Sequence, residues 1–170
     1  MKPPGYSVEL SSAFENLNED QLALVGPLFV PRHEPAGTVL FDQGDPAECI
    51  YVVIKGEVHI NYKPEDGPSL IVARIRPTGV VGWSAALGNP NYTSAAYCAD
   101  DSSMLCIRGE ELRKLYEENP EIGEIILEHL AVMIAERLRN THSHVIALLQ
   151  KGLRIKLDRK EKVEQVRESY

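Results

Sequence analysis

The spacing of apolar residues divides the chain into three parts. The first part is helical, because Asn18-Glu19-Asp20 supply a capping residue and early acidic residues before a short apolar stretch that ends near Gly26-Pro27. A strand-rich part follows and continues to Ile107, and helical spacing returns at Gly109. This order of elements predicts an α+β fold.

The strand-rich part contains seven short runs with many Val, Ile, Tyr and Thr residues, separated by turn sequences such as Gly44-Asp45-Pro46 and Lys55-Gly56. Short strands at such even spacing predict an antiparallel β-barrel or jelly roll instead of a parallel sheet. The expected strands are Phe29–His33, Thr38–Phe41, Cys49–Ile54, Glu57–Tyr62, Ser69–Ile75, Ser94–Ala99 and Met104–Ile107.

Two helices are expected after Gly109: a short one at Glu110–Glu118 and a long one from Glu121 to about Gln150. An apolar stripe near the start of the long helix is suited to pack on the barrel, and consists of Ile122, Ile126, Leu130 and Met133. A second row of apolar residues on the long helix is spaced alternately four and three residues apart. Its outer half extends beyond the part of the helix that so small a barrel could cover.

The outer half of this second row predicts a homodimer contact between two copies of the long helix. Folding of the helix back onto its own domain is the alternative, because Thr141 and the neighbouring polar residues interrupt the row. The residues expected in the dimer interface are Ile134, Leu138, Thr141, Val145 and Leu148.

A chain of 170 residues suits one domain with an appendage. We expect a loose N-terminal segment at residues 1–16, the domain at 17–150 and a charged tail at 151–170, which carries seven Lys/Arg and four Asp/Glu. No apolar run approaches the ~18 residues of a membrane span. The N-terminus lacks the apolar stretch of a secretory signal, so a cytoplasmic location is expected.

Charge and cysteine content exclude several classes of function. The net charge of −7 argues against binding of nucleic acid, which needs concentrated positive charge. Three cysteines without a CxxC motif, Cys49, Cys98 and Cys106, argue against a disulfide framework and a zinc site, and we expect reduced, partly buried thiols. No hydrolase, metalloprotease or nucleotide-triphosphate motif occurs, so no catalytic residue, metal site or cofactor is predicted.

No charged residue lies between Arg76 and Asp100, although a quarter of the chain is charged. Within this window the segment Gly79–Thr93 predicts a loop, a helical turn at Ser84–Leu87 and a second loop. One interpretation is a ligand pocket, in which N–H groups at the start of the turn receive an anion. The other is a tight barrel corner whose glycines ease packing.

Several short motifs stand in the order and spacing of the cyclic nucleotide-binding domain. They are Gly37-Thr38-Val39-Leu40-Phe41, Gln43-Gly44-Asp45, Ile50-Tyr51-Val52-Val53-Ile54, Gly56-Glu57-Val58 and, before the short helix, Leu105-Cys106-Ile107. From about Leu17 to Leu148 the chain therefore resembles this family of ligand sensors, and Gly79 and Gly82 stand where the family's phosphate-binding cassette begins.

The resemblance implies a site with two changes. In the family, backbone N–H groups and an arginine hold the cyclic phosphate, and a glutamate receives the ribose hydroxyl. Here Trp83 stands in the place of the glutamate, and the place of the arginine falls at Asn91 or Tyr92. Binding of cyclic AMP or cyclic GMP is therefore expected to be weak or absent. The expected ligand-binding residues are Gly79, Gly82, Trp83, Ser84, Ala85, Asn91, Tyr92 and Thr93.

Two functional hypotheses follow from the resemblance. The first is a regulatory module that binds a cyclic nucleotide weakly, or an altered small ligand, and signals through the long helix to a protein partner. The second is a scaffolding subunit whose pocket is vestigial. Transcription factors of this family carry a helix-turn-helix after the long helix, and no recognition helix is recognised in this acidic sequence, so direct DNA binding is not expected.

Overall fold

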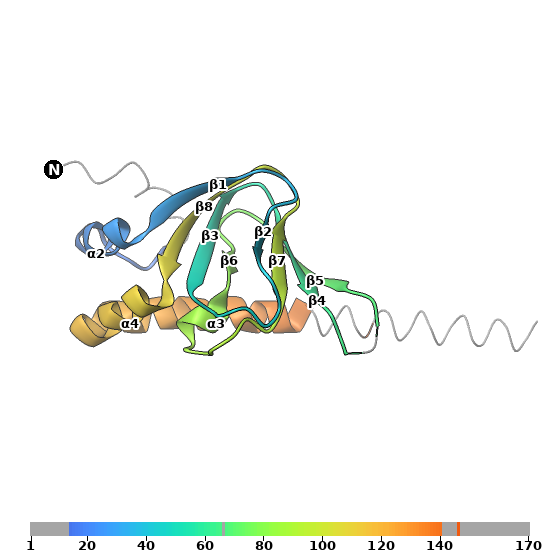
Figure 1. The fold of residues 1–170 in the computed structure, drawn as a ribbon. Coiled ribbons are helices and arrows are strands. Elements are labelled where there is room, and N and C mark those ends of the chain that lie inside the picture. Colours follow the sequence, from blue (N-terminus) through green and yellow to red (C-terminus); the bar gives the residue numbers. More distant parts are fainter. Residues whose placement is uncertain (1–13, 66, 141–145, 147–170) are drawn as a thin grey trace, which may run out of the picture. The chain divides into compact units, whose positions relative to one another are not determined.

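The computed structural model describes residues 14–65, 67–140 and 146. The chain divides into two compact units, Met1–Met133 and Ile134–Tyr170. The first unit contains two antiparallel sheets with helices before and after them in the chain, which confirms the expected α+β jelly roll (Figure 1). The expected loose N-terminal segment and basic tail fall almost entirely in residues 1–13 and 147–170, outside the described residues.

Each sheet has four strands, and every pairing is antiparallel. One sheet has the strand order β1-β8-β3-β6 and the other the order β2-β7-β4-β5. The strands are β1 (Val30–Glu34), β2 (Val39–Phe41), β3 (Cys49–Lys55), β4 (Val58–Tyr62), β5 (Leu70–Ile75), β6 (Val80–Val81), β7 (Ala95–Cys98) and β8 (Ser102–Arg108).

The sheet that contains β3 is covered on both faces, because consecutive residues of β3 belong to different clusters of the core. Val52 packs with residues of the helices, including Leu22, Leu112 and Ile122. Val53 packs instead between the two sheets, with residues such as Val58 of β4. Strands buried on both faces read as continuous apolar runs, which explains the sequence of β3, CIYVVIK.

Helix α2 (Glu19–Val25) begins where the sequence predicts. Asn18 accepts a hydrogen bond from the Gln21 backbone N–H at 2.9 Å, and the Gln21 side chain accepts one from the Asn18 N–H at 3.0 Å. This reciprocal capping box fixes the first turn. A short 3-10 helix, η1 (Gly26–Leu28), leads from α2 toward β1.

Helix α4 (Gly109–Glu118) and a second helix at residues 120–140 follow the strands. The predicted stripe that packs on the barrel is confirmed: Ile122, Ile126 and Leu130 are buried and Met133 is partly buried in the same cluster. Of the residues predicted for the dimer interface, Ile134 is partly buried and Leu138 is exposed. The others, Thr141, Val145 and Leu148, lie outside the described residues.

Two elements differ from the expected ones. Val80 and Val81 form β6, although the sequence assigns them to the charge-free loop. Two residues give too short an alternation to be recognised, and the strand exists because it pairs with Tyr51 and Val52 of β3. The helical turn α3 (Trp83–Ala86) begins one residue earlier than predicted, because Gly82 caps it.

Candidate functional site

The segment that follows β6 turns sharply at Gly82. This residue has φ of 82° and forms the N-cap of α3, a left-handed conformation that glycine adopts without strain. A Cβ atom at this position would stand 2.5 Å from the Cys49 carbonyl oxygen of β3. The glycine is therefore required twice, by its backbone angle and by the close approach of β3.

Helix α3 is anchored by burial and by α4. Ser84 and Ala85 are buried, with 3% and 0% of their surface exposed, and Trp83 is partly buried. The Ala85 carbonyl accepts a hydrogen bond from Arg113 Nη1 of α4 at 3.3 Å, and a Cβ on Gly109 would lie 2.5 Å from the same oxygen. The orphan carbonyl of this short helix is thus satisfied by α4, and the two helices are in direct contact.

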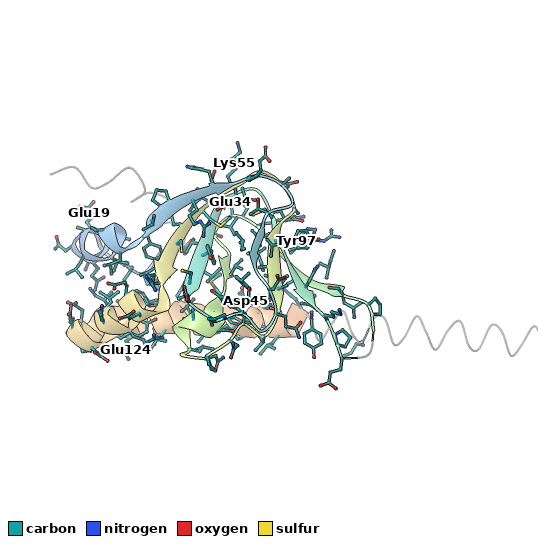
Figure 2. The ribbon with its side chains drawn as sticks, in the orientation of Figure 1. Glu19, Glu34, Asp45, Lys55, Tyr97 and Glu124 are labelled. Atoms are coloured by element: carbon teal, nitrogen blue, oxygen red, sulfur yellow. The ribbon has the colours of Figure 1, made fainter. Side chains whose placement is uncertain are left out.

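The loop after α3 is held against the turn at Gly44–Ala47. The Tyr92 N–H donates to the Asp45 carbonyl and the Gly44 N–H donates to the Tyr92 carbonyl, both at 2.9 Å. The Ala47 N–H donates to the Pro90 carbonyl at 2.9 Å, and Asn91 Nδ2 donates to the Gly44 carbonyl at 2.7 Å. Asp45 is labelled in Figure 2. These bonds form a small ladder that fixes the loop.

Tyr92 extends from this loop into the space between the sheets. Its side chain is buried, with 5% exposed, and its ring stacks on Phe41 with centroids 3.6 Å apart. Its hydroxyl accepts a hydrogen bond from the Cys49 N–H at 2.9 Å and donates one to the Cys49 carbonyl at 2.7 Å. Burial raises the pKa of the Tyr92 hydroxyl, so the side chain is neutral at physiological pH.

The predicted site residues lie in three places. Gly82, Trp83, Ser84 and Ala85 are together at α3, and Tyr92 contacts Cys49, the residue that Gly82 approaches. Gly79 lies at the far end of β6, in the turn after β5, where its N–H donates to the Arg76 carbonyl. Asn91 and Thr93 are exposed on the loop. Sequence reasoning missed Phe41 and Cys49, which receive Tyr92, although Phe41 ends one of the recognised motifs.

The two arginines that come shortly before the cassette in the sequence, Arg74 and Arg76, lie beside β4 and Glu57, the residue before it. Arg76 Nε contacts Glu57 Oε2 at 3.1 Å, and Arg74 lies opposite His59 in the pairing of β4 with β5. The hydrogen bonds from His59 and Arg76 lower the pKa of the Glu57 carboxyl, so this group is ionised at neutral pH. Arg76 is thus engaged with Glu57, the residue before β4.

The described part of the chain contains no cluster of three or more His, Cys, Asp or Glu side chains that could hold a metal ion. None of the helices in those residues has the length and apolar character of a membrane span. The three cysteines have free thiols; Cys98 and Cys106 are buried and Cys49 is partly buried, as expected.

Comparison with known proteins gives one family. A model of the cyclic nucleotide-binding domain matches residues 31–119. The chain is 24% identical to the CRP-like cAMP-activated global transcriptional regulator of Mycobacterium tuberculosis, over 80% of this chain and 59% of that protein. It is 30% identical to the cAMP-activated global transcriptional regulator CRP of Pasteurella multocida, over 65% of this chain and 52% of that protein. The chain thus spans little more than half the length of these relatives.

Solved structures agree on the fold. A cyclic nucleotide-binding domain from Methylobacillus flagellatus superposes with a TM-score of 0.77, at 14% identity and with 83% of each chain covered. The catabolite activator protein of Thermus thermophilus superposes with a TM-score of 0.66, at 24% identity, over 80% of this chain and 62% of that chain.

Proposed function

Because the chain belongs to the cyclic nucleotide-binding domain family, we propose that it is a non-catalytic regulatory module that binds a cyclic nucleotide weakly, or an altered small ligand. It works in the cytoplasm as a homodimer and signals through the helix at residues 120–140 to a protein partner. Its site is the cassette formed by Gly82, α3 and the loop that ends at Tyr92.

The observation that carries this proposal is the position of Tyr92. The resemblance puts the phosphate-binding arginine of the family at Asn91 or Tyr92. Tyr92 is neutral, buried and bonded at its hydroxyl to Cys49, and the Asn91 amide is bonded to the Gly44 carbonyl. Neither side chain supplies the bidentate cation that a cyclic phosphate requires. A buried tyrosine stacked on Phe41 favours a ligand with less charge than a nucleotide phosphate.

The cassette keeps donors that a weakly bound ligand can use. The first turn of α3 leaves backbone N–H groups, such as that of Ser84, outside the hydrogen bonds of the helix. They follow Gly82, which is the glycine that the family uses to bring its backbone close to the ligand. Backbone donors without a cation bind anions and neutral acceptors with modest affinity.

The route of the signal begins at Ala85. Because Arg113 of α4 donates to the Ala85 carbonyl and Gly109 packs against it, a shift of α3 on ligand binding is transmitted to α4. The helix at residues 120–140 follows α4 directly in the chain. Support for a dimer comes from Leu138, an apolar residue of the predicted interface, which leaves 63% of its surface exposed.

A thermal melt of ligand-stripped protein with cyclic AMP and cyclic GMP tests the proposal. A ligand at about 100 times its dissociation constant adds roughly 2.7 kcal/mol to the free energy of unfolding. We expect a small shift for the natural chain at nucleotide concentrations of about 1 mM, which corresponds to weak binding. The double variant Trp83→Glu/Asn91→Arg restores the glutamate of the family at a partly buried position and its arginine at an exposed one. We expect this variant to bind cyclic AMP at least about tenfold more tightly than the natural chain does.

The matched control is Trp83→Glu/Asn89→Arg, which adds the same charges but places the arginine elsewhere on the same exposed loop. It is expected to bind no better than the natural chain. Tight binding of cyclic AMP by the natural chain contradicts a weakened clamp. If neither a cyclic nucleotide nor a related small anion shifts the melt, the regulatory reading fails, and the scaffolding subunit with a vestigial pocket takes its place.

A further inference from the structure

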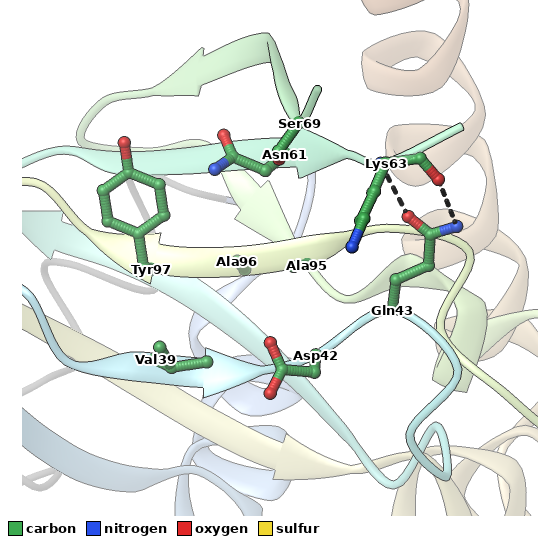
Figure 3. A pocket seen from close by; sticks show the side chains of 9 residues that line it. All are labelled: Val39, Asp42, Gln43, Asn61, Lys63, Ser69, Ala95, Ala96 and Tyr97. Atoms are coloured by element: carbon green, nitrogen blue, oxygen red, sulfur yellow. Dashed lines mark hydrogen bonds between the residues drawn. The ribbon is translucent and has the colours of Figure 1, made fainter. Parts of the chain in front are cut away.

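A pocket of about 400 Å³ lies on the sheet β2-β7-β4-β5, and none of the predicted cassette residues lines it (Figure 3). It opens on the outer face of this sheet. Ala96 is buried in the core between the sheets, so its neighbours Ala95 and Tyr97 point to the other face. Asn61 of β4 pairs with Ala95 and alternates with the buried Ile60, which places it on the same outer face.

The pocket has donors on one side and an acceptor on the other. Figure 3 shows β7 running between Asp42, which follows β2, and two residues on the other side, Asn61 of β4 and Lys63, which follows β4. Neither the Asp42 carboxylate nor the Lys63 ammonium has an ion-pair partner within residues 14–65 and 67–140. Two opposite charges that line one pocket without neutralising each other are suited to a ligand that carries both signs.

The rim beside Lys63 is held rigidly. Gln43 Nε2 donates to the Lys63 carbonyl at 3.2 Å and the Lys63 N–H donates to Gln43 Oε1 at 2.9 Å, the two bonds drawn in Figure 3. The opposite end of the pocket is fixed by Tyr97, whose hydroxyl lies 3.0 Å from His59 Nδ1. His59 Nε2 in turn lies 2.6 Å from Glu57 Oε1. A pocket with both ends bonded is largely preformed, as small-molecule sites are.

Asn61 lines the pocket with its side-chain amide. The Nδ2 atom of the same amide lies on the side of β7 in Figure 3, so it is placed to donate to a group over Ala95.

We propose that this pocket binds a free α-amino acid with an apolar side chain. The carboxylate of the ligand is held by the Lys63 ammonium and the Asn61 amide, and its ammonium group is held by the Asp42 carboxylate across β7. The apolar side chain lies on Val39, Ala95 and the ring of Tyr97. The site is separate from the cassette, so the proposal stands whether or not the cassette binds a nucleotide.

Calorimetric titration of the full chain with L-phenylalanine tests this inference, and we expect saturable binding with one site per chain. Two analogues divide the contacts: 3-phenylpropanoate lacks the ammonium group and 2-phenylethylamine lacks the carboxylate. Each loses one charge-assisted contact, so each is expected to bind at least about tenfold more weakly. The variants Lys63→Met and Asp42→Asn are expected to weaken L-phenylalanine binding by a similar factor.

Lys55→Met is the matched control, because Lys55 is an exposed lysine at the end of β3 and does not line the pocket. It is expected to change the affinity less than about twofold. The inference is overturned if no saturation occurs up to about 10 mM L-phenylalanine, well above a dissociation constant of ~1 mM. It is also overturned if 3-phenylpropanoate binds as tightly as the amino acid, or if Lys63→Met leaves the affinity unchanged while its melting temperature matches that of Lys55→Met.

Discussion

Removal of the same atom from two tyrosines is expected to change the stability of this protein in opposite directions. Tyr92 and Tyr116 both place a hydroxyl in the interior, and burial raises the pKa of both groups, that of Tyr116 to about 12. The Tyr92 hydroxyl makes two hydrogen bonds with the Cys49 backbone, at 2.7 and 2.9 Å. The Tyr116 hydroxyl is buried without a hydrogen-bond partner among the described residues.

The variant Tyr92→Phe keeps the ring that stacks on Phe41 and deletes only the hydroxyl. It leaves the N–H and the carbonyl of Cys49 without this partner, and each unsatisfied backbone group costs about 1–3 kcal/mol. We therefore expect a loss of about 2–6 kcal/mol in the free energy of unfolding. For a chain of this size, 1 kcal/mol corresponds to roughly 2–4 °C, so the melting temperature should fall by at least about 4 °C.

The variant Tyr116→Phe removes a hydroxyl that was transferred out of water without compensation. Its loss is expected to leave stability unchanged or to raise it by up to about 2 kcal/mol. Urea denaturation followed by circular dichroism gives both free energies, and equal m-values confirm that the two variants unfold from comparable states. The reasoning is refuted if Tyr92→Phe is as stable as the natural chain, or if Tyr116→Phe loses as much as Tyr92→Phe.

Two other changes test the packing around the cassette. Gly82→Ala is expected to destabilise the protein by more than about 3 kcal/mol in thermal melts, because its Cβ would stand 2.5 Å from the Cys49 carbonyl oxygen. The control is Gly37→Ala, which has a similar φ of 86° but no atom within 4 Å of its Cβ, and it should cost only about 1 kcal/mol. Equal losses of stability in the two variants would contradict the clash at Gly82. Burial raises the pKa of the Cys106 thiol from 9.0 to about 12, so its contribution to stability is complete below pH 9.0 and is lost as the pH rises toward 12. Melting temperatures of Cys106→Ala should therefore fall less steeply between pH 9 and 11 than those of the natural chain, and parallel curves would refute this assignment.

The sequence predicts most of the fold because the signals for most helices and strands lie within the elements themselves. The capping box of α2 lies within four residues of Asn18, and the strands of the two sheets carry enough apolar alternation to be located within two residues of their ends. Strand β6 was not predicted, because two residues are too few to show the alternation of apolar and polar residues that is typical of a strand. It forms because it pairs with β3, about thirty positions earlier in the chain.

The sequence predicts which segment forms the candidate site, but it does not predict the contacts that the side chains of this segment make. Glycines and turn residues mark the cassette in the sequence, and the resemblance aligns Asn91 or Tyr92 with the position of an arginine. Nothing local indicates that the Tyr92 hydroxyl reaches Cys49, which is 43 positions away. The same limit applies to the outer pocket, which Asp42 and Lys63 line together because β2 and β4 are both neighbours of β7 in the sheet.

The position of Tyr92 also bears on how much a ligand can stabilise this protein. In a site built around a ligand, backbone groups and charged side chains stay without partners until the ligand arrives, and binding then adds stability. Here the Tyr92 hydroxyl already satisfies the N–H and the carbonyl of Cys49, and its ring already covers Phe41. The folded chain needs no ligand to complete these bonds. A ligand at the cassette would therefore act through the donors of α3, which is the physical reason for the weak binding that we propose.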